Sequence, residues 1–196
     1  MIKITFLGTG TSQGIPIIGS NHPVCLSKNL KDKRLRSSVL IQWKNFNYVI
    51  DCGPDFRQQM LKSGCRRLDG ILFTHEHADH TAGLDDIRPF FFLQGDISIY
   101  GSSRVIDNLS NRFDYIFKNE NKYPGAPNVR VNTILKDNEF KLGDRTVIPI
   151  EVMHNELPVT GYRIGDFSYL TDVKYIKDDQ LLKLENTEVL IINALR

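Results

Sequence analysis

Three histidines and one aspartate fall within six residues of this chain, in the segment His75-x-His77-x-Asp79-His80. The whole chain of 196 residues holds only five histidines, so the segment concentrates most of them. The apolar run Ile71-Leu72-Phe73 directly ahead of it predicts a buried strand over residues 68–74. A buried strand that ends on such a cluster predicts a polar site at the edge of its sheet.

The spacing within the cluster indicates a metal site. Alternate residues of an extended segment share a face, so His75 and His77 can point the same way. Asp79 and His80 follow at the start of the next turn and can reach a second ion. Imidazole and carboxylate groups bind zinc, manganese and iron, and the pattern does not choose among these metals. The alternative is a polar loop with solvated or helix-capping histidines, which the density of the cluster disfavours.

Two residues much later in the chain fit the same site. His154 follows a predicted strand over residues 147–152, and Asp172 follows the strand-like residues 167–170. Both stand at strand ends, where loops place functional side chains on a rigid scaffold. Together with the cluster, they supply a third histidine for one ion and a carboxylate that can bridge two ions.

Strands and helices alternate along the rest of the chain. Residues 38–43 and 46–51 flank a short Lys44-Asn45 turn and predict a hairpin. Helices are predicted over residues 54–64, 85–93, 104–117 and 175–184, further strands over 2–7, 129–135, 140–142, 161–164 and 189–192, and a loop over 119–128. This mixture predicts a single α/β domain over residues 1–196, with helices covering its sheets.

Bulk charge gives no sign of a strongly charged partner. The 25 basic and 23 acidic side chains nearly cancel, which removes electrostatic support for non-specific nucleic-acid or membrane binding. No apolar segment has the length needed to span a bilayer, and the first residues lack the features of a signal peptide. The three cysteines have no C-x-x-C spacing and predict reduced thiols in a cytoplasmic protein.

The order of the site residues along the chain, with Asp51 ahead of them, resembles the metallo-β-lactamase superfamily over essentially the whole chain. The resemblance implies an α/β fold, the metallo-β-lactamase αββα sandwich, in which mixed β-sheets are flanked by helices. It also implies two divalent metal ions, Zn or Mn. His75, His77 and His154 would hold the first ion, Asp79 and His80 the second, and Asp172 would bridge them. Asp51 would order the histidine loop through hydrogen bonds from outside the ligand set.

Four further segments narrow the resemblance: residues 8–16, 34–38, 51–57 and 83–89. They resemble a group that includes the PhnP-like cyclic-phosphate phosphodiesterase of the carbon–phosphorus lyase pathway and is related to ribonuclease Z. This implies a hydrolase that uses a metal-activated water on a small or cyclic phosphodiester. Asp79 would be the catalytic residue that orients the nucleophile, and Arg57 and Arg88 are candidates for the substrate rim.

The glycine-rich residues 8–16 have a rival interpretation, a dinucleotide-binding fingerprint. Gly8-x-Gly10 follows a strand, but Ile15-Pro16 comes next instead of a helix, and the third glycine is misplaced. We therefore predict a structural turn that borders the active-site cleft.

Three alternative functions stay open. Ribonuclease Z-like RNA processing would require an inserted basic arm, and residues 118–122 offer only a modest insertion of mixed charge, so nucleic acid is not favoured as a partner. Thioester or lactam hydrolysis ranks lower. The third alternative is a binding protein instead of an enzyme: a non-catalytic relic of the fold that binds metal without turnover.

The chain departs from the family pattern at two places. Where many relatives carry a three-cysteine zinc knuckle, it has Ser20, His22 and Cys25. His22 and Cys25 could still hold an ion, but two ligands make a poor structural site, which favours a loop without metal. The relatives also continue past the last strand and there supply a final histidine for the second metal and a further histidine that can act as a general acid. No histidine follows His154 here. We therefore expect a domain without its C-terminal elements, either through truncation, which an end directly after a buried strand favours, or because a partner supplies the rest. The first metal site should survive this loss better than the second, which can be empty in this form, and we do not expect full activity of these residues alone.

Relatives of this kind are often dimers. The aromatic run Phe90-Phe91-Phe92 is predicted to lie either in a homodimer interface or, as is commoner for such residues, in the core.

Overall fold

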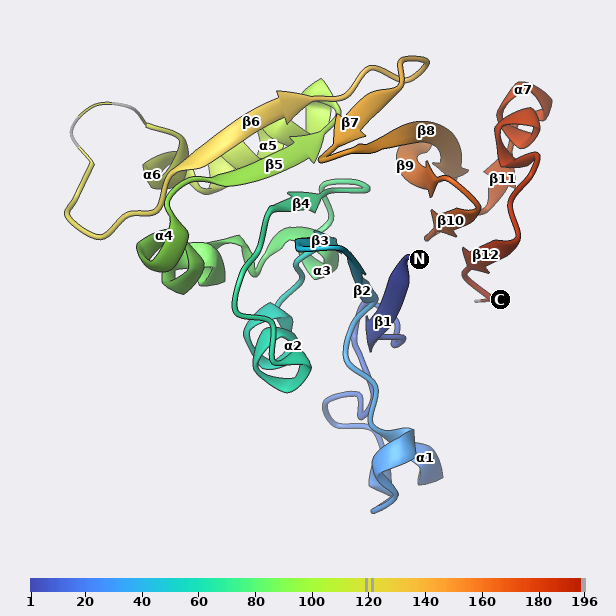
Figure 1. Ribbon diagram of the computed structural model, residues 1–196. Coiled ribbons are helices and arrows are strands. Elements are labelled where there is room, and N and C mark those ends of the chain that lie inside the picture. Colours follow the sequence, from blue (N-terminus) through green and yellow to red (C-terminus); the bar gives the residue numbers. More distant parts are fainter. Residues whose placement is uncertain (119, 121, 195–196) are drawn as a thin grey trace.

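The computed structural model describes residues 1–118, 120 and 122–194. Two β-sheets form the middle of the domain (Figure 1). The strands of the first sheet follow the chain order: β1 (Lys3–Gly8), β2 (Ser38–Trp43), β3 (Phe46–Ile50), β4 (Gly70–Leu72), β5 (Ile97–Gly101) and β6 (Val129–Thr133). Strands β1 to β3 are antiparallel, whereas β3 to β6 run parallel. This sheet is therefore mixed, as the sequence predicts.

The second sheet is built on a long hairpin. Its strand order is β11 (Tyr175–Ile176), β8 (Arg145–His154), β9 (Leu157–Ile164), β10 (Phe167–Leu170) and β12 (Val189–Ile192), and β7 (Phe140–Leu142) pairs with β8. Strand β12 runs parallel to β10, and the other pairs are antiparallel.

Helices cover the outer sides of both sheets, which gives the predicted αββα sandwich (Figure 1). Helix α2 (Phe56–Ser63) contacts β1, α5 (Ser103–Arg112) contacts β5 and β6, and α7 (Asp178–Leu181) contacts β8. The other helices are α1 (Pro23–Leu26), α3 (Ala78–Thr81), α4 (Arg88–Gln94) and α6 (Asp114–Phe117), with 3₁₀ turns at Leu30–Asp32, Leu84–Ile87 and Leu182–Leu184. No helix in the described ranges is long and apolar enough to cross a membrane.

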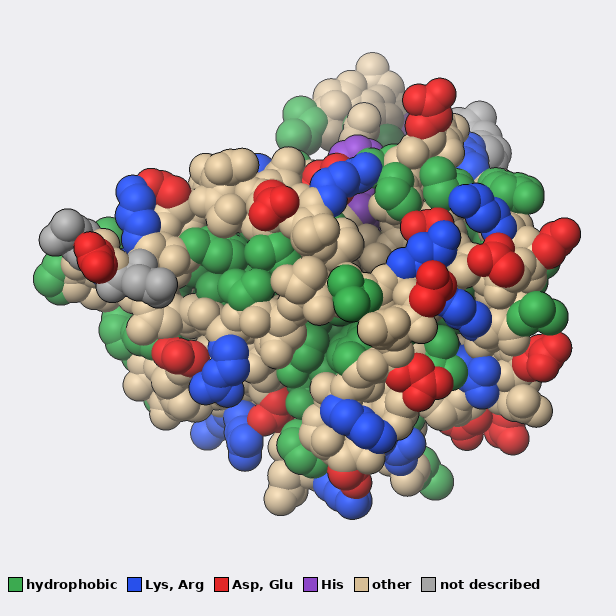
Figure 2. Space-filling view, turned by 90° about the horizontal axis from the view of Figure 1, so that it is seen from above, with side chains coloured by type: hydrophobic (Ala, Val, Ile, Leu, Met, Phe, Trp, Pro, Cys, Tyr) green, Lys and Arg blue, Asp and Glu red, His purple; other side chains and the backbone are tan. Residues whose placement is uncertain are grey.

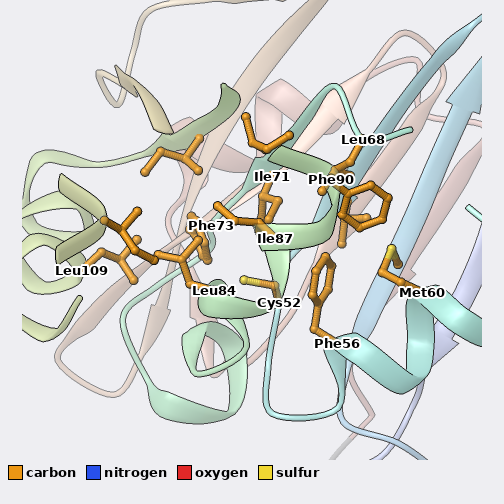
Figure 3. Packing of buried hydrophobic residues seen from close by; sticks show 14 of the residues in the cluster. Cys52, Phe56, Met60, Leu68, Ile71, Phe73, Leu84, Ile87, Phe90 and Leu109 are labelled. Atoms are coloured by element: carbon orange, nitrogen blue, oxygen red, sulfur yellow. The ribbon is translucent and has the colours of Figure 1, made fainter. Parts of the chain in front are cut away.

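The central strands are buried on both faces. In β2, Val39 and Ile41 join the apolar cluster between the sheets, while Leu40 joins the cluster beneath the helices. The alternation of side chains along a strand produces this division, and it explains why these strands have continuous apolar sequences. Figure 3 shows the cluster beneath the helices, which contains Phe56 of α2, Leu109 of α5 and Phe73 from the end of β4. The strands whose ends carry the candidate site are therefore anchored in a packed core.

The predicted hairpin over residues 38–51 is confirmed, but the helix predicted from residue 175 is wrong at its start. Tyr175 and Ile176 form β11 and pair with Met153 and Val152 of β8, so the helix begins only at Asp178. Backbone pairing with a neighbouring strand outweighs the local helical pattern here. The helix predicted over 104–117 is split at Phe113 into α5 and α6. In the loop predicted over 119–128, residues 119 and 121 lie outside the described part.

The aromatic run is divided between core and surface. Phe90 is buried in the cluster beneath the helices, whereas Phe92 is 64% exposed. The homodimer stays a prediction. Cys25, Cys52 and Cys65 are free thiols, in agreement with the prediction from their spacing.

Candidate metal centre

The site forms where strands from both sheets end. Asp51 follows β3 and His75 lies just beyond β4; because these strands are parallel, their carboxyl ends meet at one edge. In the second sheet, His154 is the last residue of β8, and Asp172 comes directly after β10 and Thr171. Asp51 and Asp172 have φ of 61° and 55°, a left-handed conformation that aspartate adopts more readily than most residues. These two bends turn the chain at the strand ends.

Two groups of side chains have their ligand atoms close enough together to hold a metal ion. The first contains His75, His77 and Asp172, and the second contains Asp79, His80 and Asp172. Within each group, the ligand atoms lie within 4.8 Å of one another. Oδ2 of Asp172 is 3.4 Å from Nε2 of His75 and 3.2 Å from Nε2 of His80. Asp172 therefore belongs to both groups, which is the geometry of a bridging carboxylate.

His154 stands beside the first group. Its ring centroid lies 5.7 Å from that of His77 and 6.2 Å from that of His75. Its Nδ1 atom is buried and has no hydrogen-bond partner among the described residues. A buried nitrogen without a partner is costly unless it binds something else. The chemistry of these residues therefore fits a metal ion, with His154 as a further candidate ligand beside the first group.

Asp51 supports the histidine segment from behind. Its carboxylate accepts hydrogen bonds from the backbone N of Thr74 at 2.8 Å and from Thr74 Oγ1 at 2.7 Å. It also accepts from Nδ1 of His80 at 2.6 Å. The bond at Nδ1 leaves Nε2 of His80 facing Asp79 and Asp172, each at 3.2 Å. Asp51 thus orients His80, a candidate ligand, although Asp51 itself belongs to neither group.

Burial and neighbouring charges shift the pKa values of two histidines and one aspartate in the cluster. Burial and the neighbouring charge of His80 lower the pKa of His75 to about 3, so this imidazole is neutral and free to bind metal. Burial opposes the charged form of His80, but the charge of Asp51 and hydrogen bonds to three carboxylates outweigh it and raise the pKa well above its usual value. Burial likewise opposes ionisation of Asp172, but His80 outweighs it and lowers the pKa to about 2.

The cluster opens into a cavity of about 300 Å³, which is the lower end of the size range for small-molecule sites. Histidine side chains are visible at the surface in Figure 2, with acidic and basic side chains beside them. The glycine-rich loop supplies part of the wall, as the sequence predicts. The lining consists of Gly10, Thr11, Ser12, Ser37, His77, Asp79, His80, His154 and Asp172.

Other predicted residues lie away from this cavity. Neither Arg57 nor Arg88 is among its lining residues; Nη2 of Arg88 instead donates to Asp85 Oδ1 at 2.6 Å and to the Tyr123 hydroxyl at 2.7 Å. Their role at the substrate rim stays a prediction. His22 caps α1 by accepting from the backbone N of Val24, and it joins no group of three ligands among the described residues. The loop without metal stays a prediction.

The structure adds contacts that the sequence did not indicate. Arg104 and Arg112 of α5 both bond to Glu76, inside the histidine segment. No local pattern marks these two arginines, because Glu76 lies 28 and 36 positions earlier in the chain. Thr11, Ser12 and Ser37, which line the cavity, belong instead to segments that the sequence already singles out.

A protein-family match and a similar solved structure indicate the same family for this chain. Residues 46–196 match the beta-lactamase superfamily domain. A solved structure described as a new diphosphatase from the PhnP family is similar, with a TM-score of 0.87 and 36% identity over 97% of this chain and 73% of that chain.

Two curated relatives share only part of their length with this chain. An octanoyltransferase of Porphyromonas gingivalis is 40% identical over all 196 residues, which make up 39% of that protein. A ribonuclease Z of a Bradyrhizobium species is 33% identical over 112 residues, 55% of this chain and 32% of that protein. The chain therefore spans less than half the length of either relative.

The domain match covers more than half of the chain, and the paired histidine and aspartate groups lie at the strand ends of an αββα sandwich. The chain belongs to the beta-lactamase superfamily and has the metallo-β-lactamase fold.

Proposed function

We propose that this protein is a metal-dependent phosphodiesterase that hydrolyses a small or cyclic phosphodiester. The observation that carries the proposal is the position of Asp172, whose carboxylate belongs to both groups of candidate ligands. A shared carboxylate is the feature that lets one site hold two cations close together. The similarity to a PhnP-family diphosphatase and to ribonuclease Z supports phosphorus as the centre attacked, since both kinds of enzyme cleave P–O bonds.

The residues have separate tasks in this proposal. His75, His77 and His154 would hold one cation, Asp79 and His80 the other, and Asp172 both. Two Zn or Mn ions bound there would supply an activated water and draw charge from the phosphoryl oxygens. Asp79 lines the cavity and would orient the attacking water toward phosphorus. Asp51 keeps His80 in the tautomer whose Nε2 faces the cavity.

The second group supplies three ligand residues, Asp79, His80 and Asp172. The further histidine expected for the second ion stays a prediction.

RNA processing finds less support. A basic arm that grips RNA should present free cations. Lys118 instead pairs with Asp114, and Lys122 donates to the carbonyls of Ile116 and Pro127 within its own loop. Both described lysines of this segment thus already have partners within the chain.

One observation favours a second candidate, hydrolysis of an acyl thioester. A groove of about 320 Å³ opens beside Asp172, and Phe6, Tyr169, Leu170, Ile191 and Ile192 supply its apolar wall. An octanoyl chain is apolar, and the relative that matches the entire chain is named an octanoyltransferase. Assays with octanoyl thioesters compared with phosphodiesters separate the two candidates.

The decisive experiment is a His77→Ala variant of the full-length protein, assayed with bis(p-nitrophenyl) phosphate and with cyclic phosphodiesters. We expect turnover to fall by more than about 100-fold. Changing a hydrogen-bond partner of a metal ligand already costs roughly 10–100-fold in metal affinity or activity, and His77 is itself a candidate ligand. An Arg66→Ala variant is the control, because Arg66 is exposed and lies outside the cavity lining. Unchanged turnover in His77→Ala would remove the cluster from the reaction. Metal binding without turnover in the unmodified protein would indicate a non-catalytic relic.

A further inference from the structure

Glu76 is the one carboxylate of the histidine segment that takes no part in either metal group. It lies between the candidate ligands His75 and His77. One of its oxygens, Oε1, accepts from Nη2 of Arg104 at 2.6 Å. The Glu76 side chain is only 18% exposed, so this ion pair lies partly within the protein. The pair joins the segment to the first turn of helix α5.

The other end of α5 holds the same segment. Nη1 of Arg112 donates to the backbone carbonyl of Glu76 at 3.1 Å and to Oγ1 of Thr81 at 2.8 Å. Thr81 is fully buried, and its hydroxyl donates to the carbonyl of His77 at 2.9 Å. One guanidinium group thus contacts the chain on both sides of His77. His77 itself is exposed and needs such support more than the buried His75 does.

Helix α5 is a rigid base for these two arginines. Its Val105 and Leu109 are buried in the core cluster beneath the helices, and the Ser102 hydroxyl caps its first turn. Residues 104 and 112 are eight positions apart, a little over two turns of an α-helix at about 3.6 residues per turn. Both side chains therefore project from one side of a fixed helix toward residues 76–81.

We propose that the α5 arginine pair, Arg104 and Arg112, are positioning residues for the metal centre. Arg112 holds the backbone of Glu76 and Arg104 holds its side chain, both from outside the site, so that His75 and His77 stay directed at the same cation. Neither arginine belongs to a core cluster, and the Arg104 side chain is 44% exposed, so we expect the two arginines to act on metal affinity more than on folding. This inference rests on the metal centre of the proposed function.

The test compares Arg112→Met and Arg104→Met with the unmodified protein. Zn²⁺ affinity is measured by competition with a chromophoric chelator, and the thermal midpoint is measured on the metal-free proteins. We expect Arg112→Met to weaken Zn²⁺ binding by roughly 10–100-fold, the range for groups that orient metal ligands. Arg104→Met should have a smaller effect, because it touches only the side chain of Glu76. The visible spectrum of bound Co²⁺, which reports histidine ligation, should change in Arg112→Met.

Two further variants make the result specific. Arg112→Lys keeps the charge and one donor, and it should recover part of the lost affinity. Arg66→Met removes an exposed arginine elsewhere and should bind Zn²⁺ as the unmodified protein does. Unchanged Zn²⁺ affinity in Arg112→Met would overturn the proposal, as would a thermal midpoint lowered so far that the metal-free variant is unfolded. If the unmodified protein itself binds no Zn²⁺ or Mn²⁺, the proposed function fails with it; if it binds metal and Arg112→Met binds equally well, only this inference fails.

Discussion

Nδ1 of His80 lies 2.6 Å from Oδ2 of Asp51, and both side chains are buried. The same carboxylate also accepts two hydrogen bonds from Thr74. One buried aspartate therefore fixes both ends of the histidine segment, the residue before His75 and the imidazole of His80. Such a bond sets the tautomer and the direction of a metal-binding imidazole.

An Asp51→Asn variant should lose roughly 10–100-fold in metal affinity, as is usual when the hydrogen-bond partner of a ligand is changed. Asparagine tolerates the left-handed backbone of residue 51, so the turn itself should survive. The measurement is chelator competition with Zn²⁺ and Mn²⁺. Asp144→Asn is a matched control, because Asp144 bonds Trp43 and Lys44 and takes no part in either metal group. Equal affinities for the two variants would contradict the role given to Asp51.

A Gly53→Ala variant should displace the metal ligands. A Cβ atom at position 53 would lie 1.9 Å from the carbonyl oxygen of Asp79, so the backbone of residue 79 must move. We expect metal binding to be lost or strongly weakened, measured by elemental analysis after dialysis. Gly64→Ala is the comparison: its φ of 68° makes alanine unfavourable by about 1 kcal/mol, but no atom lies within 4 Å of the added Cβ. If Gly64→Ala loses metal equally, the effect comes from general instability.

A Tyr162→Phe variant should lower the free energy of unfolding by about 1–3 kcal/mol, the cost of removing one partner of a buried hydrogen bond. The Tyr162 side chain is fully buried, and its hydroxyl donates to the carbonyl of Phe73 at 2.5 Å. Urea denaturation of the metal-free protein measures the change. Tyr175→Phe, at a tyrosine that is 58% exposed, should stay within about 0.5 kcal/mol of the unmodified protein. A similar loss in both variants would argue against the bond to Phe73.

Metal affinity should rise with pH across roughly pH 6 to pH 8. The pKa of His80 is raised well above 6.5 in the metal-free protein, because Asp51 and two further carboxylates outweigh the effect of burial. The imidazole thus carries a proton that a cation must displace, and raising the pH removes this competition by up to about tenfold per pH unit. Asp172, with its pKa near 2, stays ionised throughout.

Titration calorimetry in buffers of different ionisation enthalpy tests this directly. Binding of the second cation should release about one proton near neutral pH. Affinity that is flat with pH, together with no proton release, would show that His80 is not a ligand.

The local features of the site could be predicted from the sequence. The apolar run ahead of His75, the alternation of His75 and His77, and the turn at Lys44 are short-range patterns governed by strand geometry. The continuous apolar run Ile71-Leu72-Phe73 also indicates a buried strand. By contrast, residues 175–176 were predicted as helix, because only the approach of β8 turns them into a strand.

That imidazoles and carboxylates gather at the end of a buried strand follows from the amino-acid sequence, because the backbone fixes the spacing of neighbouring residues. Three features become visible only once the chain is folded: Asp172 joins both groups, Nδ1 of His154 is buried without a partner among the described residues, and α5 contacts Glu76 through Arg104 and Arg112. These contacts join residues that are 28 to 97 positions apart, counting from Arg104 to Glu76 and from Asp172 to His75. Their meeting depends on how two sheets pack against each other, and that packing is a property of the whole core.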